Sequence, residues 1–536
     1  TNTLAVKATY QLDTPRRGPL FLDTFKIDMK KAHANGRALT WEYDTSHEEL
    51  GSRLHLKGLD GDNSFTLEFR TSPEASALQW LTAAQTLGGE HPFLYSQCQN
   101  IHARSVFPCQ DTPSVRFTYS AEVEVPSALR AVMAAEQEIG QERSGIFLFK
   151  MPQPIPSYLF AIAVGDLVFR ELGPRTGIYA EPELIEAAAW EFAGTEATLR
   201  EAEKLFGPYM WGRYDMLVLP PSFPFGGMEN PRLTFVTPTA IVGTRGQTNL
   251  ITHELAHAWT GNLITNATWA DFWLNEGWTV WAERRILEAL HGEHEATVSW
   301  AIGQKALDDS IARFGTDSPL TKLRTDLTGV DPDDAFSSIP YEKGARFVTL
   351  LERHVGRDKF DRFVRDYLSK FRFTSITTEE FMEFVETKLP GTAAAVDARA
   401  WLYDTGLPAT AHVLNACGDR YLFAVSLAAC MQRGIVTLLP PARTPGVIAH
   451  SIIAVENPDD PKEKWNDGVV EYSSAHLEGM ASELIVHSSH STQSEPQTIE
   501  EVRRILLQHL AELQAFPYAA PVVAENSVPW GMARTE

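Results

Sequence analysis

The most informative stretch of this chain is His253-Glu254-Leu255-Ala256-His257, and Glu276 follows 19 residues after His257. Histidines four positions apart lie on one face of an α-helix, one turn from each other, so both imidazoles can bind one tetrahedral Zn²⁺. The gap before Glu276 is long enough for this helix to end, for a loop to follow, and for a second helix to run back alongside the first. That second helix would carry Glu276 as a third ligand. Two histidines and one carboxylate leave one coordination position open, as in catalytic zinc sites. The spacing therefore predicts a catalytic site with one zinc ion per chain.

The alternative is a helix whose two histidines are ordinary surface or core residues. The chain has 16 histidines and 69 acidic residues, which gives on the order of 0.06 chance matches to such a motif. A glutamate required at position 276 lowers that expectation by about tenfold, so we favour the zinc site. We expect most of the nearby tryptophans to pack in the core and not to contact substrate: Trp259, Trp269, Trp273, Trp278 and Trp281.

A second motif, Gly226-Gly227-Met228-Glu229-Asn230, follows a proline-rich loop. Two glycines let the backbone approach a ligand closely, and the carboxylate of Glu229 can bind a cation. Taken alone, the motif reads as a turn before a strand. Beside a zinc motif it suggests a binding site.

Hydrophobic periodicity divides the chain into three parts. Residues 1–170 are rich in alternating, strand-like patterns, the clearest at 115–125, with shorter ones at 64–70 and 165–172. Residues 171–410 are predicted to be mostly helical, with one strand at 214–219. The expected helices cover 181–206, 248–262, 276–291, 342–355 and 377–388, the last with a capping box at Thr377 and Glu380. Residues 411–536 carry short strand-like runs at 435–439, 452–455 and 484–486 and a closing helix at 498–516. The expected fold class is multidomain α+β.

Composition and charge exclude several classes of function. A chain of 536 residues with 44% hydrophobic residues is too long for one core and too apolar for wholesale disorder. The formal net charge of −22 repels phosphate backbones and anionic lipids, so we expect no nucleic-acid partner. No apolar run reaches the ~18–20 residues that a membrane span needs.

The four cysteines, at positions 98, 109, 417 and 430, form no CxxC pair and no disulfide framework. The cysteines therefore do not show whether the protein works in a reducing or an oxidising compartment. We expect a cytoplasmic location, with a periplasmic or secreted one, after removal of a signal segment, as the alternative.

Together these motifs resemble those of the gluzincin zinc aminopeptidases. The strings at 96–99, 217–229, 259–263 and 338–344 are similar to the leukotriene hydrolase/aminopeptidase branch of that family, and the resemblance covers about residues 1–415. It implies an N-terminal β-sheet saddle domain (1–170), a thermolysin-like catalytic domain (171–410) and a smaller α/β segment (411–536) of uncertain role. It also implies an aminopeptidase that cleaves peptides with a free N-terminus by attack of metal-activated water.

The resemblance assigns roles to individual residues. His253, His257 and Glu276 would be the zinc ligands, and Glu254 would be the general base. Tyr341 would donate a hydrogen bond to the tetrahedral oxyanion. Glu229 would bind the free α-amine of the substrate. The remaining substrate-binding residues implied by the matching motifs are Gly226, Gly227, Met228, Gln97 and Gln99.

Two features depart from the family's pattern. Phe336 occupies a position where leukotriene-processing members carry tyrosine, although Asp333 matches an acidic residue that they use in epoxide hydrolysis. We therefore favour peptide hydrolysis, with leukotriene epoxide hydrolysis at the same site as an alternative.

The other departure begins near residue 415, where the family's long C-terminal helical domain is not recognisable. Asp467 and His490 lie in segments that resemble the acid and histidine loops at the end of an α/β-hydrolase. A serine-type esterase is thus a further alternative, but no Gly-x-Ser-x-Gly elbow occurs in the chain. A third is a binding protein whose metal site is inactive.

Overall fold

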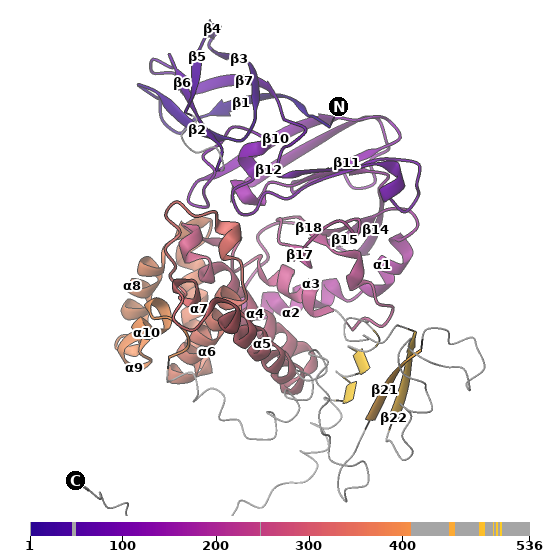
Figure 1. Ribbon diagram of the computed structural model, residues 1–536, viewed down its shortest axis with the longest axis vertical. Coiled ribbons are helices and arrows are strands. Elements are labelled where there is room, and N and C mark those ends of the chain that lie inside the picture. Colours follow the sequence, from indigo (N-terminus) through magenta and orange to yellow (C-terminus); the bar gives the residue numbers. More distant parts are fainter. Residues whose placement is uncertain are drawn as a thin grey trace, which may run out of the picture. The chain divides into compact units, whose positions relative to one another are not determined.

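The computed structural model describes residues 2–44, 50–246, 248–408, 450–455 and 482–487, with residues 497, 500, 501, 504 and 505 (Figure 1). The chain forms two compact units, Thr1–Ser426 and Leu427–Glu536. In the described residues, no helix is long and apolar enough to cross a membrane.

The N-terminal strands fall into two groups. The strands of the first group form two small sheets around one hydrophobic core. The first two sheets have the orders β1-β7-β3-β4 and β2-β6-β5. Leu54, Leu56 and Leu67 are fully buried between them. The strands are β1 (Ala5–Gln11), β2 (Leu20–Thr24), β3 (Asp28–Ala34), β4 (Arg37–Ala38), β5 (Thr40–Asp44), β6 (Ser52–Lys57) and β7 (Ser64–Arg70).

The second group contains the alternating strand that the sequence predicted at 115–125. This strand is β10 (Arg116–Glu124), and it pairs antiparallel with β12 (Ile146–Pro156). Beside it lies a sheet of order β11-β13-β9-β8, which consists of β8 (Leu78–Leu81), β9 (Phe93–Ser96), β11 (Arg130–Met133) and β13 (Ile162–Gly165). The end of β9 leads directly into Gln97 and Gln99, so this sheet positions both glutamines.

A five-stranded sheet of order β14-β15-β16-β18-β17 opens the catalytic part. Its strands are β14 (Val168–Gly173), β15 (Thr176–Ala180), β16 (Tyr214–Val218), β17 (Gly227–Met228) and β18 (Leu233–Val236). The three middle strands are parallel and buried throughout, as expected for strands covered on both faces. The predicted strand at 214–219 is confirmed as β16. β17 is a short antiparallel edge strand, and Glu229 follows it directly.

The helices of this part are α1 (Ile185–Glu191), α2 (Thr195–Phe206), α3 (Thr248–Ala256), α4 (Trp273–His291), α5 (Glu293–Phe314), α6 (Gly344–Val355), α7 (Arg357–Phe371), α8 (Thr378–Lys388), α9 (Thr392–Ala395) and α10 (Ala398–Tyr403). A parallel strand pair, β19 (Ile264–Asn266) and β20 (Thr374–Ile376), lies among them. The capping box of α8 is confirmed, because Thr377 and Glu380 bond each other's backbone.

Two of the helix predictions need correction. The expected single helix at 181–206 is two helices, α1 and α2, separated by a turn that ends at Gly194. The helix expected at 248–262 ends at Ala256, after which the amides of Ala258 and Trp259 bond three residues back instead of four. Gly261, with φ +106°, then turns the chain toward β19. The helices α5 and α7 were not predicted.

Helix α4 is the centre of the catalytic part, and every residue from Trp273 to Leu287 is buried. All five tryptophans that were considered as core residues are buried, at 9% exposure or less. A Cβ added to Gly277 would lie 2.7 Å from Cα of Gly344, so α4 and α6 meet backbone to backbone. This contact brings the π-helical turn Ile339–Lys343, which carries Tyr341, against the turn of α4 that carries Glu276.

In the C-terminal unit, β21 (His450–Val455) pairs parallel with β22 (Ser482–His487). They confirm the strands predicted at 452–455 and 484–486. The strand predicted at 435–439 and the residues Asp467 and His490 lie outside the described residues, as does most of the helix predicted at 498–516. The division of the chain at residues 170 and 410 stays our proposal.

Candidate active site

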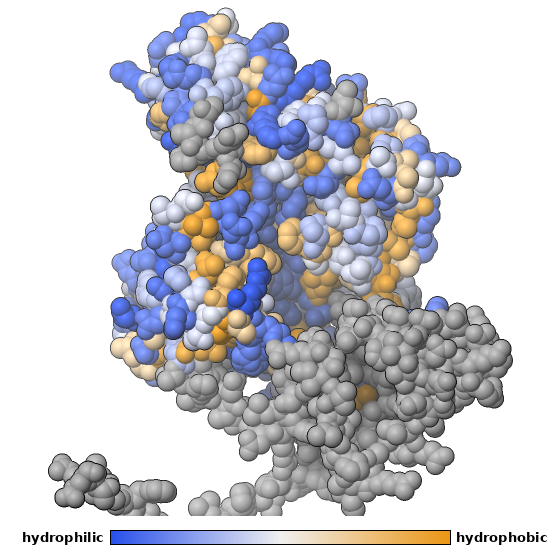
Figure 2. Space-filling model, in the orientation of Figure 1, coloured by the Kyte–Doolittle hydropathy of each residue, from blue (hydrophilic) through white to orange (hydrophobic). Residues whose placement is uncertain are grey.

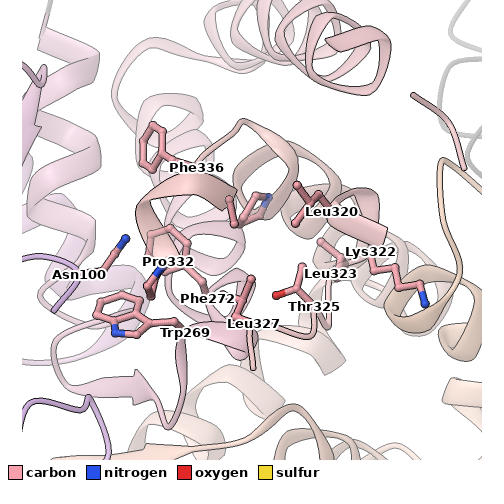
Figure 3. Close-up of a pocket in the computed structure, with 12 residues that line it drawn as sticks. Asn100, Trp269, Phe272, Leu320, Lys322, Leu323, Thr325, Leu327, Pro332 and Phe336 are labelled. Carbon is pink, nitrogen blue, oxygen red and sulfur yellow. The ribbon is translucent and has the colours of Figure 1, made fainter. Parts of the chain in front are cut away.

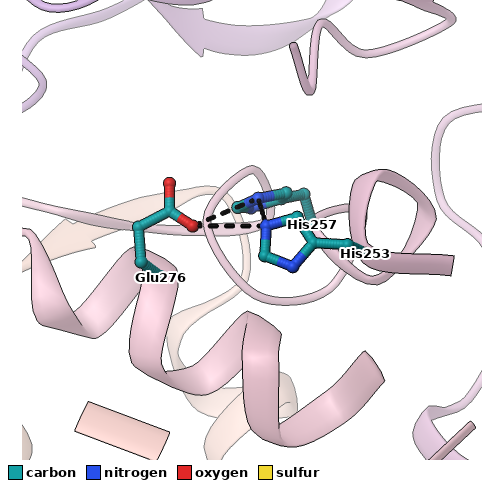
Figure 4. Close-up of side chains that lie close together, drawn as sticks. All are labelled: His253, His257 and Glu276. Carbon is teal, nitrogen blue, oxygen red and sulfur yellow. Dashed lines mark hydrogen bonds and ion pairs between the residues drawn. The ribbon is translucent and has the colours of Figure 1, made fainter. Parts of the chain in front are cut away.

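Helices α3 and α4 bring the three predicted metal ligands together (Figure 4). The Nε2 atoms of His253 and His257 lie 3.2 Å apart. Oε2 of Glu276 lies 3.4 Å from the first and 3.6 Å from the second. Although α3 ends at Ala256, the amide of His257 still donates to the carbonyl of His253, at 3.3 Å, so the helical spacing of the two imidazoles is kept.

The hydrogen bonds of the outer ring nitrogens test whether this cluster fits a metal ion. Nδ1 of His253 lies 3.1 Å from Oε2 of Glu283, and Nδ1 of His257 lies 3.1 Å from the carbonyl oxygen of Thr260. Both partners are acceptors, so each ring can hold its proton on Nδ1, which leaves the Nε2 lone pair for a metal ion. Oε2 of Glu276 is buried and accepts no hydrogen bond. Two ring nitrogens and a carboxylate oxygen that converge in this way fit a cation.

Glu254 stands beside this cluster because Gly227 makes room for it. A Cβ at position 227 would lie 2.3 Å from Oε1 of Glu254, and one at Gly226 would lie 3.2 Å from Leu250. The two glycines therefore let the edge strand β17 pass directly over α3. Burial raises the pKa of Glu254 well above its usual value, and the carboxylate of Glu229 adds to this effect. A raised pKa suits a group that must both accept and return a proton near neutral pH.

Glu229 is 4% exposed and lies on the wall of the cleft. The side-chain amide of Asn262 donates to its backbone oxygen at 2.7 Å. The amide of Asn275 donates to its Oε1 at 3.4 Å and to the hydroxyl of Tyr158 at 3.2 Å. Burial, followed by repulsion from Glu276, raises the pKa of Glu229 to about 8. The free energy of this site is therefore lowered when a positive charge arrives beside Glu229.

Tyr341 lines the same cleft beside His253. Its ring is stacked on that of His253, with centroids 6.2 Å apart and an angle of 22° between the planes. Burial, and then the charge of Glu276, raises the pKa of Tyr341 well above its usual value. The phenol therefore keeps its proton at neutral pH and can donate a hydrogen bond.

The glutamines of the N-terminal part differ in where they point. Gln99 lines the cleft, whereas Nε2 of Gln97 donates to Sδ of Met228 at 3.1 Å. Met228 is itself 3% exposed. Gln97 and Met228 thus support the floor beside Glu229, and Gln99 borders the open space.

One cleft of about 760 Å³ is lined by the three candidate metal ligands and by Glu254, Glu229, Tyr341 and Gln99. Phe225, Phe336 and one face of α5 complete its lining. Figure 2 shows the described surface hollowed between the helices of the catalytic part and the part that carries β17 and α3. A cleft of this volume has room for a peptide of a few residues.

Comparison with known proteins identifies the family. The peptidase M1 N-terminal domain matches residues 5–159, and the peptidase family M1 domain matches residues 190–400. The chain belongs to peptidase family M1. It is 46% identical over 403 residues to leukotriene A-4 hydrolase of Xenopus laevis, and 44% identical over 405 residues to leucine aminopeptidase 2 of Aspergillus terreus. The match covers 73% of this chain but only 66% of the length of each relative.

A solved structure agrees with this assignment. Yeast LTA4 hydrolase in complex with bestatin is 39% identical, with a TM-score of 0.74 over 80% of this chain and 70% of that chain. The M1 family uses a catalytic zinc ion, and the three converging donors described above fit one.

Several side chains that shape this M1 site were not predicted from the sequence. Glu283 orients His253, Thr279 lies 3.1 Å from Nδ1 of His257, and Asn275 and Asn262 hold Glu229. A signal for Glu283 does exist, because it lies seven residues after Glu276 and therefore on the same face of α4. The two asparagines give no such signal, because their contacts arise only when separate segments pack.

A second, smaller pocket of about 30 Å³ adjoins the cleft (Figure 3). It is lined mainly by apolar side chains such as Trp269, Phe272 and Leu327, and Phe336 borders both cavities. Near it, Asp333 accepts a hydrogen bond from Asn100 and lies 2.8 Å from Nε2 of His102. These two bonds tie the N-terminal part to the loop before Tyr341.

Proposed function

We propose that this chain is a zinc-dependent aminopeptidase that releases N-terminal residues from peptides. The observation that carries the proposal is the position of Glu229. Its carboxylate lies within 4.8 Å of the nearest ligand atoms of Glu254 and His257. A substrate ammonium bound at Glu229 therefore places the first peptide bond, and no later one, beside the metal ligands.

The chain's own residues divide the chemistry of this hydrolysis. A zinc ion held by His253, His257 and Glu276 supplies a Lewis acid for the scissile carbonyl group. Glu254 accepts a proton from the attacking water and returns it to the leaving amine. The hydroxyl of Tyr341 donates to the oxygen of the former carbonyl as negative charge develops on it, which favours the transition state over the substrate.

The direct test is hydrolysis of leucine p-nitroanilide. We expect release of p-nitroaniline by the purified chain, loss of that activity with a zinc chelator, and recovery when zinc is added back. Glu254→Gln should retain zinc but lower kcat by about 10²–10⁴-fold, because it removes the general base. Activity that survives both the chelator and Glu254→Gln would contradict the proposal.

Epoxide hydrolysis at the same site is a second candidate, since one of the relatives is a leukotriene A-4 hydrolase and Asp333 is fixed by Asn100 and His102 beside the apolar pocket. We rank it below peptide hydrolysis, because Phe336 offers no hydroxyl group there. The esterase alternative depends on Asp467 and His490, which lie outside the described residues.

Cytoplasmic location is our proposal for the compartment. The two cysteines in the described residues, Cys98 and Cys109, are both free and buried. Free thiols are typical of reducing compartments.

A further inference from the structure

The cleft is strongly acidic, which limits what can bind along it. Glu229, Glu254, Glu276 and Glu283 all line it. Glu342, another lining residue, is neutralised by Arg284 and Arg346. Among the described lining residues, the side chains able to carry positive charge are the two metal-binding histidines and Arg313.

Arg313 lies on the face of α5 that borders the cleft. Ala306 and Ser310, seven and three residues earlier on the helix, line the cleft as well, which is the spacing of one helical face. The amide of Ser338 donates to Oγ of Ser310 at 3.2 Å, so this face is fixed against the segment that leads to Tyr341.

Within the described residues, the guanidinium of Arg313 has room for a ligand. Arg313 is exposed, and in the described part of the chain no acidic side chain forms an ion pair with it. Asp309, one turn earlier, is bonded to Lys305 at 2.5 Å. The guanidinium lies 5.1 Å from the ring of the neighbouring Phe314.

We propose that Arg313 binds a carboxylate of the peptide substrate on the leaving-group side of the cleft. The proposal rests on the proposed aminopeptidase function. Glu229 holds the positively charged end of the peptide, so the remainder extends past acidic side chains that offer a negative group no ion pair. In this part of the cleft a substrate carboxylate can form an ion pair with Arg313, whose planar guanidinium suits a bidentate contact. The substrates favoured by this arrangement are short peptides with a free C-terminal carboxylate or an acidic side chain after the cleaved bond.

The experiment compares pairs of peptides that differ in one carboxylate. The first pair is Leu-Gly-Gly with a free C-terminus and its C-terminal amide; the second is the amides of Leu-Glu-Gly and Leu-Gln-Gly. For wild-type protein we expect the acidic member of at least one pair to have the higher kcat/KM, by about two- to fivefold, because an exposed ion pair is worth little more. The preference should shrink as salt is raised.

Arg313→Gln should abolish that preference through KM, and Arg313→Lys should keep part of it. Arg353→Gln is the matched control: Arg353 is exposed on α6 and does not line the cleft, so the same loss of charge should leave the ratio within a pair unchanged. A change in the first pair identifies the C-terminal carboxylate as the ligand, and a change in the second identifies an acidic side chain.

Two results would overturn the inference. In the first, the ratio of kcat/KM within each peptide pair is the same in wild-type protein and in Arg313→Gln, while leucine p-nitroanilide is still cleaved. The aminopeptidase proposal would then stand without the inference about Arg313. The other is an Arg353→Gln variant that loses the preference as fully as Arg313→Gln, which would assign it to overall charge. Failure to cleave leucine p-nitroanilide would refute both proposals together.

Discussion

At the scale of single residues, spacing in the sequence predicts that the proposed metal ligands and the proposed general base lie together, but it does not predict the groups that orient them. His253, His257 and Glu254 share one helical motif, and Glu276 comes one loop later, so local geometry nearly determines their meeting. The partners of the ring nitrogens depend on how α3 and α4 pack, which a single sequence does not contain. Glu283 is the clearest case, since it lies 3.1 Å from Nδ1 of His253.

The first prediction concerns that hydrogen bond. Glu283→Gln removes the charge behind His253, so the imidazole becomes a weaker ligand and zinc affinity should fall by about 10–100-fold. Competition with a chromogenic chelator measures it. Glu288→Gln, later on the same helix and paired at the surface with Arg357, should leave zinc affinity unchanged. Equal affinities for the two variants would refute this role of Glu283.

The second prediction concerns Gly227. A methyl group there would lie 2.3 Å from Oε1 of Glu254 and must displace that carboxylate. Gly227→Ala should therefore lower kcat by about 10²-fold while the zinc content stays near one per chain. Steady-state kinetics with metal analysis tests this. Gly194→Ala is the control, because a Cβ there meets nothing within 4 Å. An active Gly227→Ala variant would show that Glu254 does not depend on this close approach.

At the scale of elements, the periodic patterns predicted β10, β16 and α8 well but merged α1 with α2. A tertiary contact forms where the two helices are separated. Glu191, the last residue of α1 and 1% exposed, accepts hydrogen bonds from the amides of Gly243 and Arg245, each at 2.7 Å. These bonds fix the end of α1 to the loop before α3, and no local pattern reveals them.

This contact gives a third prediction. Glu191→Ala leaves two backbone amides without their charged acceptor, so the free energy of unfolding should fall by about 1.5–3 kcal/mol per lost bond at most. Urea denaturation measures the loss. Glu186→Ala, on the same helix and exposed, removes only a surface ion pair with Arg170 and should cost about 1 kcal/mol or less. A smaller loss for Glu191→Ala than for Glu186→Ala would contradict the account.

A fourth prediction concerns pH and the turn that carries Tyr341. Burial lowers the pKa of Lys343 from 10.5 to about 7, although its ammonium group donates to the carbonyls of Thr321 and Asp404. Between pH 7 and 10.5 the unfolded chain therefore binds this proton more readily than the folded one, and stability gains from this lysine as the pH rises. The free energy of unfolding should increase more from pH 7 to pH 9 in the wild type than in Lys343→Met. Parallel pH profiles for the two proteins would refute the shifted pKa.

At the scale of the whole molecule, the strand-rich part and the helical part of the first unit together line one cleft. The charges of the lining side chains favour some substrates over others. The sequence predicted an α+β protein with a metal site from motifs that are short and local. It did not predict the ties between the parts, such as the bonds of Arg116 to the Asn262 carbonyl oxygen at 2.6 Å and to Thr265 at 2.8 Å. These ties join residues nearly 150 positions apart, so only the folded chain reveals them. The negative net charge, −22, agrees with a cleft that attracts the ammonium group of a peptide.

The central claim is that Glu229 selects a free amino terminus beside the metal ligands. The most direct measurement is the ratio of kcat/KM for a leucyl peptide to that for its N-acetylated form, in wild-type protein and in Glu229→Ala. We predict a ratio of at least about 10²-fold in the wild type, since acetylation removes the charge that Glu229 binds, and a ratio near one in the variant. Equal cleavage of free and acetylated peptides by the wild-type protein would contradict the claim.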